Sequence, residues 1–217
     1  MLIKVGADPF PPYQFITDTG TAGMDYELVK EAFALGGIDI EVTLKVWPEI
    51  EKDYDNGLMR ALFQVQPTEE RMKANLFSEE LRKAVTELIT SRDGEHPQSL
   101  EPFYDGYFLA VLEGYSYGDD IDAVPEERKR RYPTQESLLL AVADGKEAYG
   151  VFDRGVRFYL QQNLGIDGIT ALPGMDFLRP LAVMFGKDDG ELRDSFDKGL
   201  RKMKEDGTCQ KIVDKWE

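Results

Sequence analysis

An arginine follows a helix start signal in the stretch "QVQPTEERMKANLFSEE", residues 64–80. Thr68 predicts a helix N-cap, and Glu69 and Glu70 then lie in the first turn, where the helix dipole favours anions. Arg71 falls near the third helical position, where a cation meets unpaired N–H groups at a cost of about 0.3–1 kcal/mol. Two interpretations are open: the Arg71 side chain extends into solvent or pairs with a neighbouring glutamate, or Arg71 and the helix start bind an anion.

The overall composition limits the classes of partner. The length of 217 residues allows either one domain or two small lobes, and 42% apolar residues are enough to form a core. With 26 basic and 41 acidic residues the net charge is −15, which repels a phosphate backbone, so nucleic acid is not expected as a partner. The basic run "RKRR", residues 128–131, directly follows "PEE" and is interpreted as a solvated helix face rather than a binding patch.

The residues that serve metal and nucleophile chemistry are scarce. Cys209 is the single cysteine, so an internal disulfide and a Cys-rich metal site are excluded, and the single histidine, His96, lies in a loop-like run. The sequence indicates neither a zinc site nor a Ser-His-Asp triad, and we expect no metal, no cofactor and no catalytic residue. The sequence has no apolar run of about 18 residues and starts with a strand-like alternation, without a signal peptide. The segment is therefore expected either to be a mature extracytoplasmic domain with an added Met or to be cytoplasmic.

Strands and helices alternate along the chain, which is typical of a mostly parallel sheet. Apolar residues recur at helical spacing between Met24 and Leu35, and the following glycines end that helix. The segment "ELRKAVTELITS", residues 80–91, has helix-forming residues at its start and an alternating end, and residues 84–90 are interpreted as a strand. Further strands are expected at residues 2–7, 38–46, 61–65, 107–112, 147–152 and 178–186, and further helices from Thr68 and at residues 134–145, 153–165 and 190–205, with short segments at 47–56 and after "GYSYGDD".

Across nearly its whole length the sequence resembles the family 3 extracellular solute-binding proteins. The segments that carry the resemblance, in the family's order, are "IKVGADPFPPYQF", "GTAGMDYELVKEAF", Trp47, "PTEERMKANLFSE", "VLEGYSYGDD", "ESLLLAVADGKEAYGVFD" and "ELRDSFDKGLRKMKEDGTCQKIVDKW". The resemblance implies an α/β type II periplasmic-binding fold with two lobes, each a mixed, mostly parallel sheet flanked by helices, joined by two hinge strands. Lobe 1 would comprise residues 1–88 and 179–217, lobe 2 would comprise residues 89–178, and a ligand would be bound between them.

The resemblance also assigns residues that hold the backbone of a bound amino acid. It implies that Arg71 binds the α-carboxylate, for which a guanidinium fork is well shaped. It implies that Asp153 binds the α-amino group and that Ser116 and Tyr117 of "GYSYGDD" lie at the ligand, Ser116 donating to its carboxylate. The alternative for Ser116 and for Asp153 is a helix N-cap with no ligand role.

Side-chain recognition is implied for a second group. An aromatic wall of Phe10 and Trp47 would contact the ligand, and Asp8 would receive a cationic or donor group, whereas Gln64 and Gln66 would lie around the amino group. The alternatives are that Phe10 and Trp47 pack in lobe 1 and that the two glutamines are solvated strand ends.

Two stretches depart from the family pattern. An acidic residue often precedes the third strand, where this chain has "GLMRALFQ", and the common "FS.PY" is "FSEEL" here. Neither departure touches the proposed arginine clamp, but the second alters the segment that leads into the hinge.

The resemblance implies a monomeric periplasmic or extracellular protein that delivers a polar amino acid to the permease of an ABC transporter, without turnover and without membrane insertion of this segment. One alternative is the ligand-sensing domain of a membrane receptor such as a histidine kinase. A second alternative is a cyclohexadienyl or arogenate dehydratase, for which Glu69 or Glu113 would serve as the acid.

Overall fold

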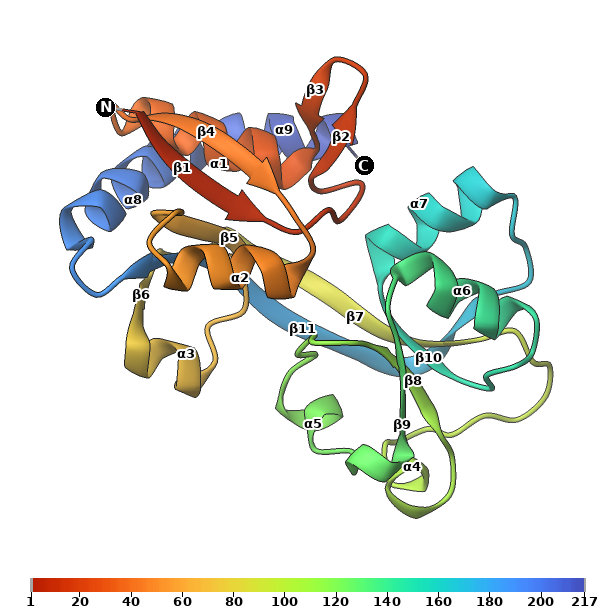
Figure 1. Ribbon diagram of the computed structural model, residues 1–217. Helices are drawn as coiled ribbons and strands as arrows, with labels where there is room; N and C mark the ends of the chain where they lie inside the picture. The colour runs from red at the N-terminus through yellow and green to blue at the C-terminus, as the bar shows by residue number, and fades with distance from the viewer. Residues whose placement is uncertain (1, 217) are drawn as a thin grey trace. The chain divides into compact units, whose positions relative to one another are not determined.

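A computed structural model describes residues 2–216 of the chain (Figure 1). The chain forms two compact units: unit 1 runs up to Lys83 and resumes at Pro180, and unit 2 spans Ala84–Arg179. The sequence-based boundaries follow residues 88 and 178 instead. Strands β7 (Arg82–Thr90) and β11 (Thr170–Gly186) each contain residues of both units, so the chain passes from one unit to the other along these two strands.

The sheet of unit 1 has the strand order β4-β1-β5-β11, with β6 also paired to β11. Its other strands are β1 (Leu2–Ala7), β4 (Asp39–Leu44), β5 (Ala61–Val65) and β6 (Asn75–Phe77). Strand β1 pairs in parallel with β4 and with β5, whereas β11 runs antiparallel to β5. The carboxyl ends of β4, β1 and β5 therefore meet at one edge of the sheet, and the loops that follow these strands are neighbours.

A short hairpin of β2 (Phe15–Thr17) and β3 (Gly20–Ala22) was not predicted from the sequence. Its turn is closed by the Thr17 hydroxyl, which donates to the Gly20 carbonyl at 2.9 Å. Gly20 adopts a φ of 122°, a backbone conformation that residues with a Cβ rarely adopt. The hairpin pairs too few residues to show a clear strand alternation.

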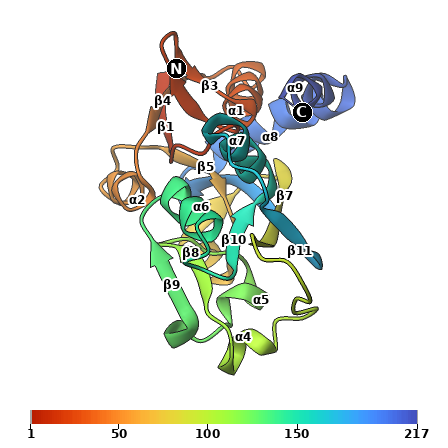
Figure 2. The ribbon, with the colours of Figure 1, turned by 90° about the vertical axis from the view of Figure 1, so that its right-hand side faces the viewer.

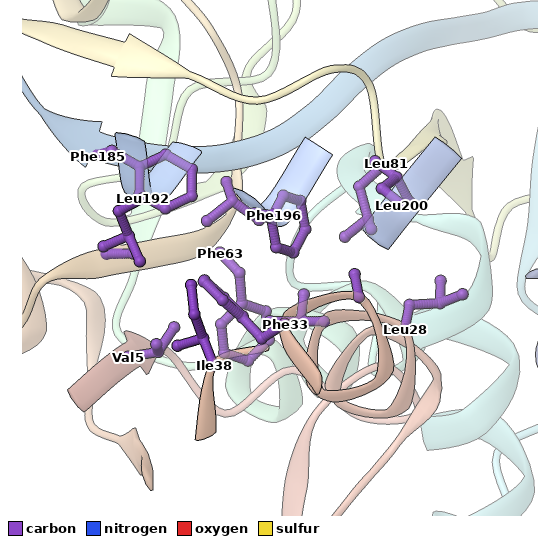
Figure 3. Close-up of a cluster of buried hydrophobic side chains, with 14 of the residues drawn as sticks. Val5, Leu28, Phe33, Ile38, Phe63, Leu81, Phe185, Leu192, Phe196 and Leu200 are labelled. Carbon is purple, nitrogen blue, oxygen red and sulfur yellow. The ribbon is translucent and has the colours of Figure 1, made fainter. Parts of the chain in front are cut away.

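Helices cover both faces of the unit 1 sheet (Figure 1). They are α1 (Met24–Leu35), α2 (Trp47–Asp55), α3 (Glu69–Ala74), α8 (Gly190–Glu205) and α9 (Thr208–Trp216). On one face, Phe33 of α1, Phe185 of β11 and Phe196 of α8 pack against one another at the centre of the main core (Figure 3). Helices α1 and α8 approach so closely that a Cβ on Gly199 would lie 1.9 Å from the Ala32 carbonyl oxygen.

Helix α2 packs on the opposite face of the same sheet. Its Ile50 is fully buried in a second apolar cluster with Leu62 of β5 and Met184 of β11, and Trp47 packs against the edge of that cluster. Trp47 begins α2 shortly after β4 ends, so packing on this face fixes the indole at the edge where the parallel strands end.

Unit 2 has its own sheet, in which β7 is followed in order by β10, β8 and β9 (Figure 2). Its further elements are α4 (Pro102–Asp105), β8 (Leu109–Leu112), α5 (Asp119–Asp122), the 3-10 turn η1 (Glu126–Arg128), β9 (Lys129–Tyr132), α6 (Gln135–Ala143), β10 (Gly150–Asp153) and α7 (Arg154–Leu164). Strand β8 pairs in parallel with β9 and β10, and β10 runs antiparallel to β7. Helix α6 contacts β8, β9 and β10, and α7 contacts β10.

The interpretation of "RKRR" as a helix face is wrong. Arg128 ends the 3-10 turn, and the three basic residues after it belong to β9, at the edge of the sheet. Arg130 pairs with the buried Glu147 at 3.1 Å and Arg131 pairs with Glu126 at 2.6 Å. Glu126 lies just before the run, but Glu147 lies 17 positions from Arg130, so the local sequence does not reveal that partner. Charged side chains on an edge strand also discourage pairing with another chain.

Candidate functional site

Arg71 is held at the start of α3 by the predicted N-cap. The Thr68 hydroxyl oxygen accepts from the Arg71 backbone N–H at 3.3 Å, so the arginine is at the third helical position. Its guanidinium lies 5.1 Å from the centre of the Trp47 ring and donates to the Gln66 carbonyl at 3.3 Å. The side chain is 22% exposed and lies 3.8 Å, Nη2 to Oε1, from Glu51 of α2. The glutamate nearest to the guanidinium thus comes from another helix and not from the first turn of α3.

This environment suits a bound anion. A separation of 3.8 Å is longer than a hydrogen bond, so Glu51 and Arg71 attract each other without one. Burial raises the pKa of the Glu51 carboxyl, although the Arg71 charge opposes that shift. A ligand carboxylate offers the guanidinium two parallel hydrogen bonds, and the Trp47 ring supports one face of the fork.

A loop after β1 brings polar groups to the same sheet edge. It is closed by the Phe10 N–H, which donates to the Gln14 carbonyl at 2.7 Å. Within it, Asp8 is buried, and loss of solvation raises the pKa of its carboxyl to about 7. Phe10 is also buried, at 5% exposure, so it packs in unit 1 as the alternative interpretation required. Its role at a ligand stays a prediction.

Gln14 is a candidate that the sequence reasoning missed. It is fully buried, and its Nε2 donates to the Asp8 carbonyl at 3.1 Å and to the Gln64 Oε1. A glutamine between Tyr13 and Phe15 in a proline-rich loop has no pattern that predicts burial, because only the closed loop turns it inward. The contact joins the loop after β1 to the end of β5.

The end of β5 has an unusual backbone. Gln64 has a φ of 61°, and among residues 2–216 no other residue except glycine has a positive φ. Such a conformation in a residue with a Cβ is uncommon and concentrates at functional sites. Three buried side-chain atoms close by, Gln14 Oε1, Gln64 Nε2 and Gln66 Oε1, have no hydrogen-bond partner in the described part of the chain.

The altered "FSEEL" stretch leads into a contact with the same loop. Arg82, the first residue of β7, places its guanidinium 3.7 Å from the centre of the Tyr13 ring. Its Nε donates to the buried Asp25 of α1 at 2.7 Å, and Tyr13 stacks on Phe10 with ring centres 6.0 Å apart. The first residue of this connecting strand is thereby tied to the loop that carries Asp8.

In unit 2, Ser116 and Tyr117 lie on the turn between β8 and α5. The Ser116 hydroxyl donates to Asp122 Oδ2 at 2.5 Å, and the Tyr117 N–H donates to Oδ1 of the same carboxylate at 2.9 Å. The Tyr117 hydroxyl is buried and accepts from the Leu112 N–H at 2.9 Å, and burial raises its pKa. Both side chains thus bond within unit 2, and their roles at a ligand stay predictions.

Asp153 ends β10 and caps α7, as its alternative interpretation stated. It is 2% exposed, and its Oδ1 accepts from the N–H groups of Gly155 and Val156 at 3.0 and 3.3 Å. Its role toward an α-amino group stays a prediction.

Arg179 connects the predicted residues of unit 2, and the sequence reasoning missed it. Its Nη1 donates to the Ser116 carbonyl at 3.2 Å, and its Nε donates to Thr86, which pairs with Asp153 across β7 and β10. Arg179 was interpreted only as part of the strand at residues 178–186. Since its partners are remote in sequence, no local signal marks it.

Other site types are not represented in the described residues. Between residues 2 and 216, no group of three or more His, Cys, Asp and Glu side chains is arranged to hold a metal ion. In the same range no helix is both long enough and apolar enough to cross a membrane.

The arrangement defines the class of the type II periplasmic binding proteins: two α/β units connected by two strands, with candidate polar groups after the carboxyl ends of parallel strands. Within that class, the chain belongs to the bacterial extracellular solute-binding proteins, family 3, whose model matches residues 3–217. The family and the fold class predicted from the sequence are confirmed.

Two relatives from Bacillus subtilis (strain 168) share this family resemblance. The probable amino-acid-binding protein YxeM is 27% identical over 93% of this chain and 83% of its own length. The arginine-binding extracellular protein ArtP is 25% identical over 100% of this chain and 85% of its own length.

Solved structures support the same fold. A histidine kinase sensor domain with similarity to periplasmic binding proteins superposes with a TM-score of 0.88 at 23% identity, covering 99% of this chain and 95% of its own. An ancestral arginine-binding protein bound to arginine superposes with a TM-score of 0.86 at 22% identity, covering 99% of this chain and 97% of its own. At these identities the likeness establishes the fold and not the ligand.

Proposed function

We propose that this protein captures a small polar amino acid outside the cytoplasm and delivers it to the permease of an ABC transporter. The observation that carries the proposal is Arg71 at the third position of α3, with its guanidinium next to the Trp47 ring. The membership in a family of extracellular solute-binding proteins and the amino-acid-binding relatives support it further.

The binding mode follows from the charges of an amino acid. In this proposal the α-carboxylate binds Arg71 and the α-amino group binds Asp153. Capture is proposed to occur by hinge closure, which would exclude water and strengthen both contacts. At ~1 kcal/mol per heavy atom, a ligand of about ten such atoms reaches sub-micromolar affinity.

The decisive experiment is calorimetric titration of the purified protein with the twenty amino acids, followed by the best ligand with Arg71→Ala. Loss of a charge-paired arginine costs about 2–5 kcal/mol, so the affinity is expected to fall by at least ~30-fold. The matched control is Arg60→Ala, which removes another unit 1 arginine, one that is paired with Asp189, and is expected to bind normally. Normal binding by Arg71→Ala would overturn the carboxylate role.

A sensor domain is the second candidate, favoured by the superposition on the histidine kinase sensor domain. Both candidates bind a ligand, so titration does not separate them. Neighbouring genes for a permease and an ATPase would support transport, whereas fusion of this segment to a kinase would support sensing.

Catalysis has less support. A dehydratase needs a carboxylic acid shielded from water, and the two acids considered for that role, Glu69 and Glu113, are both exposed. A further superposition is with an ancestral amino-acid-binding protein described as a precursor of cyclohexadienyl dehydratase. Formation of phenylalanine from prephenate or arogenate would contradict the proposal of a binding protein without turnover.

A further inference from the structure

The orientation of one buried amide is fixed by the backbone. Gln14 lies fully buried in the loop after β1, with its Nε2 3.1 Å from the Asp8 carbonyl oxygen. A carbonyl oxygen accepts hydrogen bonds and cannot donate them, so the Gln14 amide must turn its nitrogen toward it. The reversed amide would place two oxygens against each other. The Gln14 Oε1 therefore points away from Asp8.

The first amide fixes a second one. The Gln14 Nε2 also donates to the Oε1 of Gln64, so the Gln64 amide turns its oxygen toward Gln14 and its nitrogen away. The left-handed backbone of Gln64 holds the side chain in this place. As a result, one acceptor, Gln14 Oε1, and one donor, Gln64 Nε2, are buried on two hydrogen-bonded amides without a partner of their own anywhere in residues 2–216.

We propose that this amide pair selects ligands whose side chain ends in a neutral group with both a donor and an acceptor, such as a carboxamide or a ureido group. A carboxamide gives its oxygen to Gln64 Nε2 and an N–H to Gln14 Oε1, so both buried atoms are satisfied. The inference rests on the proposed function, because it names the ligand class of the same site.

Charged ligands satisfy only half of the pair. An ammonium or a guanidinium group has no acceptor and would set its N–H groups against the Gln64 nitrogen. A carboxylate has no donor and would set its oxygens against Gln14 Oε1. Burial raises the pKa of Asp8 to about 7, so near neutral pH this loop does not offer a full negative charge to attract a cation.

The amide pair also indicates different roles for Gln64 and Gln66. Both were expected around the α-amino group, which needs acceptors only. Gln66 has its buried Oε1 without a partner in the described chain and suits that role, whereas Gln64 presents a nitrogen. The structure thus favours the α-amino group for Gln66 and the ligand side chain for Gln64.

The experiment is calorimetric titration at pH 7.5 with L-glutamine, L-asparagine and L-citrulline against L-arginine, L-lysine and L-glutamate. Because an unsatisfied buried polar group weakens binding by roughly 10- to 100-fold, at least one neutral ligand is expected to bind that much more tightly than all three charged ones. Tighter binding of arginine, lysine or glutamate would overturn the inference while leaving amino-acid capture intact. Binding of none of the six, with no binder among the other amino acids, would overturn the proposed function as well.

Gln64→Glu is the variant that tests the mechanism of selection. One carboxylate oxygen still accepts from Gln14 Nε2, and the other replaces the donor with a charged acceptor. The preference is expected to shift by at least about tenfold from the neutral ligands toward arginine or lysine. Gln162→Glu, which makes the same change at an exposed position of α7, is expected to leave the preference unchanged.

A second variant guards against misfolding of the first. Gln14→Met keeps the volume of the buried side chain but frees the Gln64 amide to rotate, so the discrimination between neutral and cationic ligands is expected to fall without reversing. An unchanged preference in both variants would show that the pair does not contact the ligand, and it would overturn the inference.

Discussion

The two units differ in how far their own polar groups satisfy the predicted site residues. In unit 2, Ser116 bonds Asp122 and Asp153 accepts two backbone N–H groups, so both are held in place before any ligand arrives. In unit 1, buried amide atoms of Gln14 and Gln64 lack partners in the described chain. Buried polar groups are normally paired, so the exceptions mark where another molecule completes the set. In the proposal made above, unit 1 therefore holds the groups that would distinguish ligands.

One buried carboxyl from each unit shows a similar contrast. Glu87 of unit 2 is 1% exposed and accepts from Arg157 at 2.5 Å and from Arg154 at 3.0 Å. Asp8 of unit 1 is similarly buried, but loss of solvation dominates its environment and raises its pKa to about 7. A carboxylate with two arginine partners supports the fold, whereas a carboxyl that burial holds partly protonated carries a cost that only a function explains.

The largest expected effect is the pH dependence caused by Asp8. Its pKa rises from 3.8 in the unfolded chain to about 7 in the folded protein, so between these values the folded state binds more protons. The contribution of Asp8 to the free energy of unfolding is therefore unchanged below about pH 4 and falls as the pH rises to about 7. A shift of about three pKa units corresponds to as much as ~4 kcal/mol. The free energy of unfolding, measured by urea unfolding at pH values from 4 to 8, tests this dependence.

Asp8→Asn provides the comparison. The amide cannot ionise, so at pH 8 the variant is expected to be more stable than the parent protein, and the difference is expected to vanish near pH 4. The matched control is Asp18→Asn in the β2–β3 turn, where the side chain is exposed and no such change is expected. Equal pH profiles for Asp8→Asn and the parent protein would show that Asp8 ionises freely and would remove this contrast between the units.

The local part of the site could be predicted from the sequence. The N-cap at Thr68 and the place of Arg71 depend only on residues close in the chain, and both follow from helix capping. The strand that precedes Asp8 and the strand that contains Gln64 are continuous apolar or alternating runs. Their carboxyl ends meet because β1 and β5 pair in parallel, which the alternation of strands and helices already indicates.

The remaining part depends on contacts between distant residues. Gln14 reaches Gln64 across 50 positions and Arg179 reaches Thr86 across 93, and neither pair is marked by spacing or by composition. The strand character of "RKRR" depends on β8 and Glu147 in the same way. The sequence therefore predicted Arg71, Gln64 and Gln66 as site residues, but it missed Gln14 and Arg179, whose partners are distant in the chain.

The next effect in size tests whether Asp153 is only a cap. Asparagine caps helices about as well as aspartate, whereas alanine costs about 1–2 kcal/mol. Asp153→Ala is therefore expected to lower the free energy of unfolding by that amount, and Asp153→Asn is expected to leave it nearly unchanged. Both variants are expected to bind an amino acid at least tenfold more weakly, because the charged partner of the α-amino group is lost. Normal binding by Asp153→Asn would restrict Asp153 to its structural role.

The smallest effect is expected at Gln64, where the site itself costs stability. A left-handed backbone disfavours a residue with a Cβ by roughly 1 kcal/mol, and glycine has no such penalty. Without ligand, Gln64→Gly is expected to raise the melting temperature by up to about 2–4 °C, although the greater freedom of glycine in the unfolded chain reduces the gain. The same change at Gln66, which lacks a positive φ, is expected to lower it. If both glycine variants melt at a lower temperature than the parent protein, the left-handed backbone of Gln64 does not destabilise unit 1. The link between ligand selection and a loss of stability at Gln64 would then be wrong.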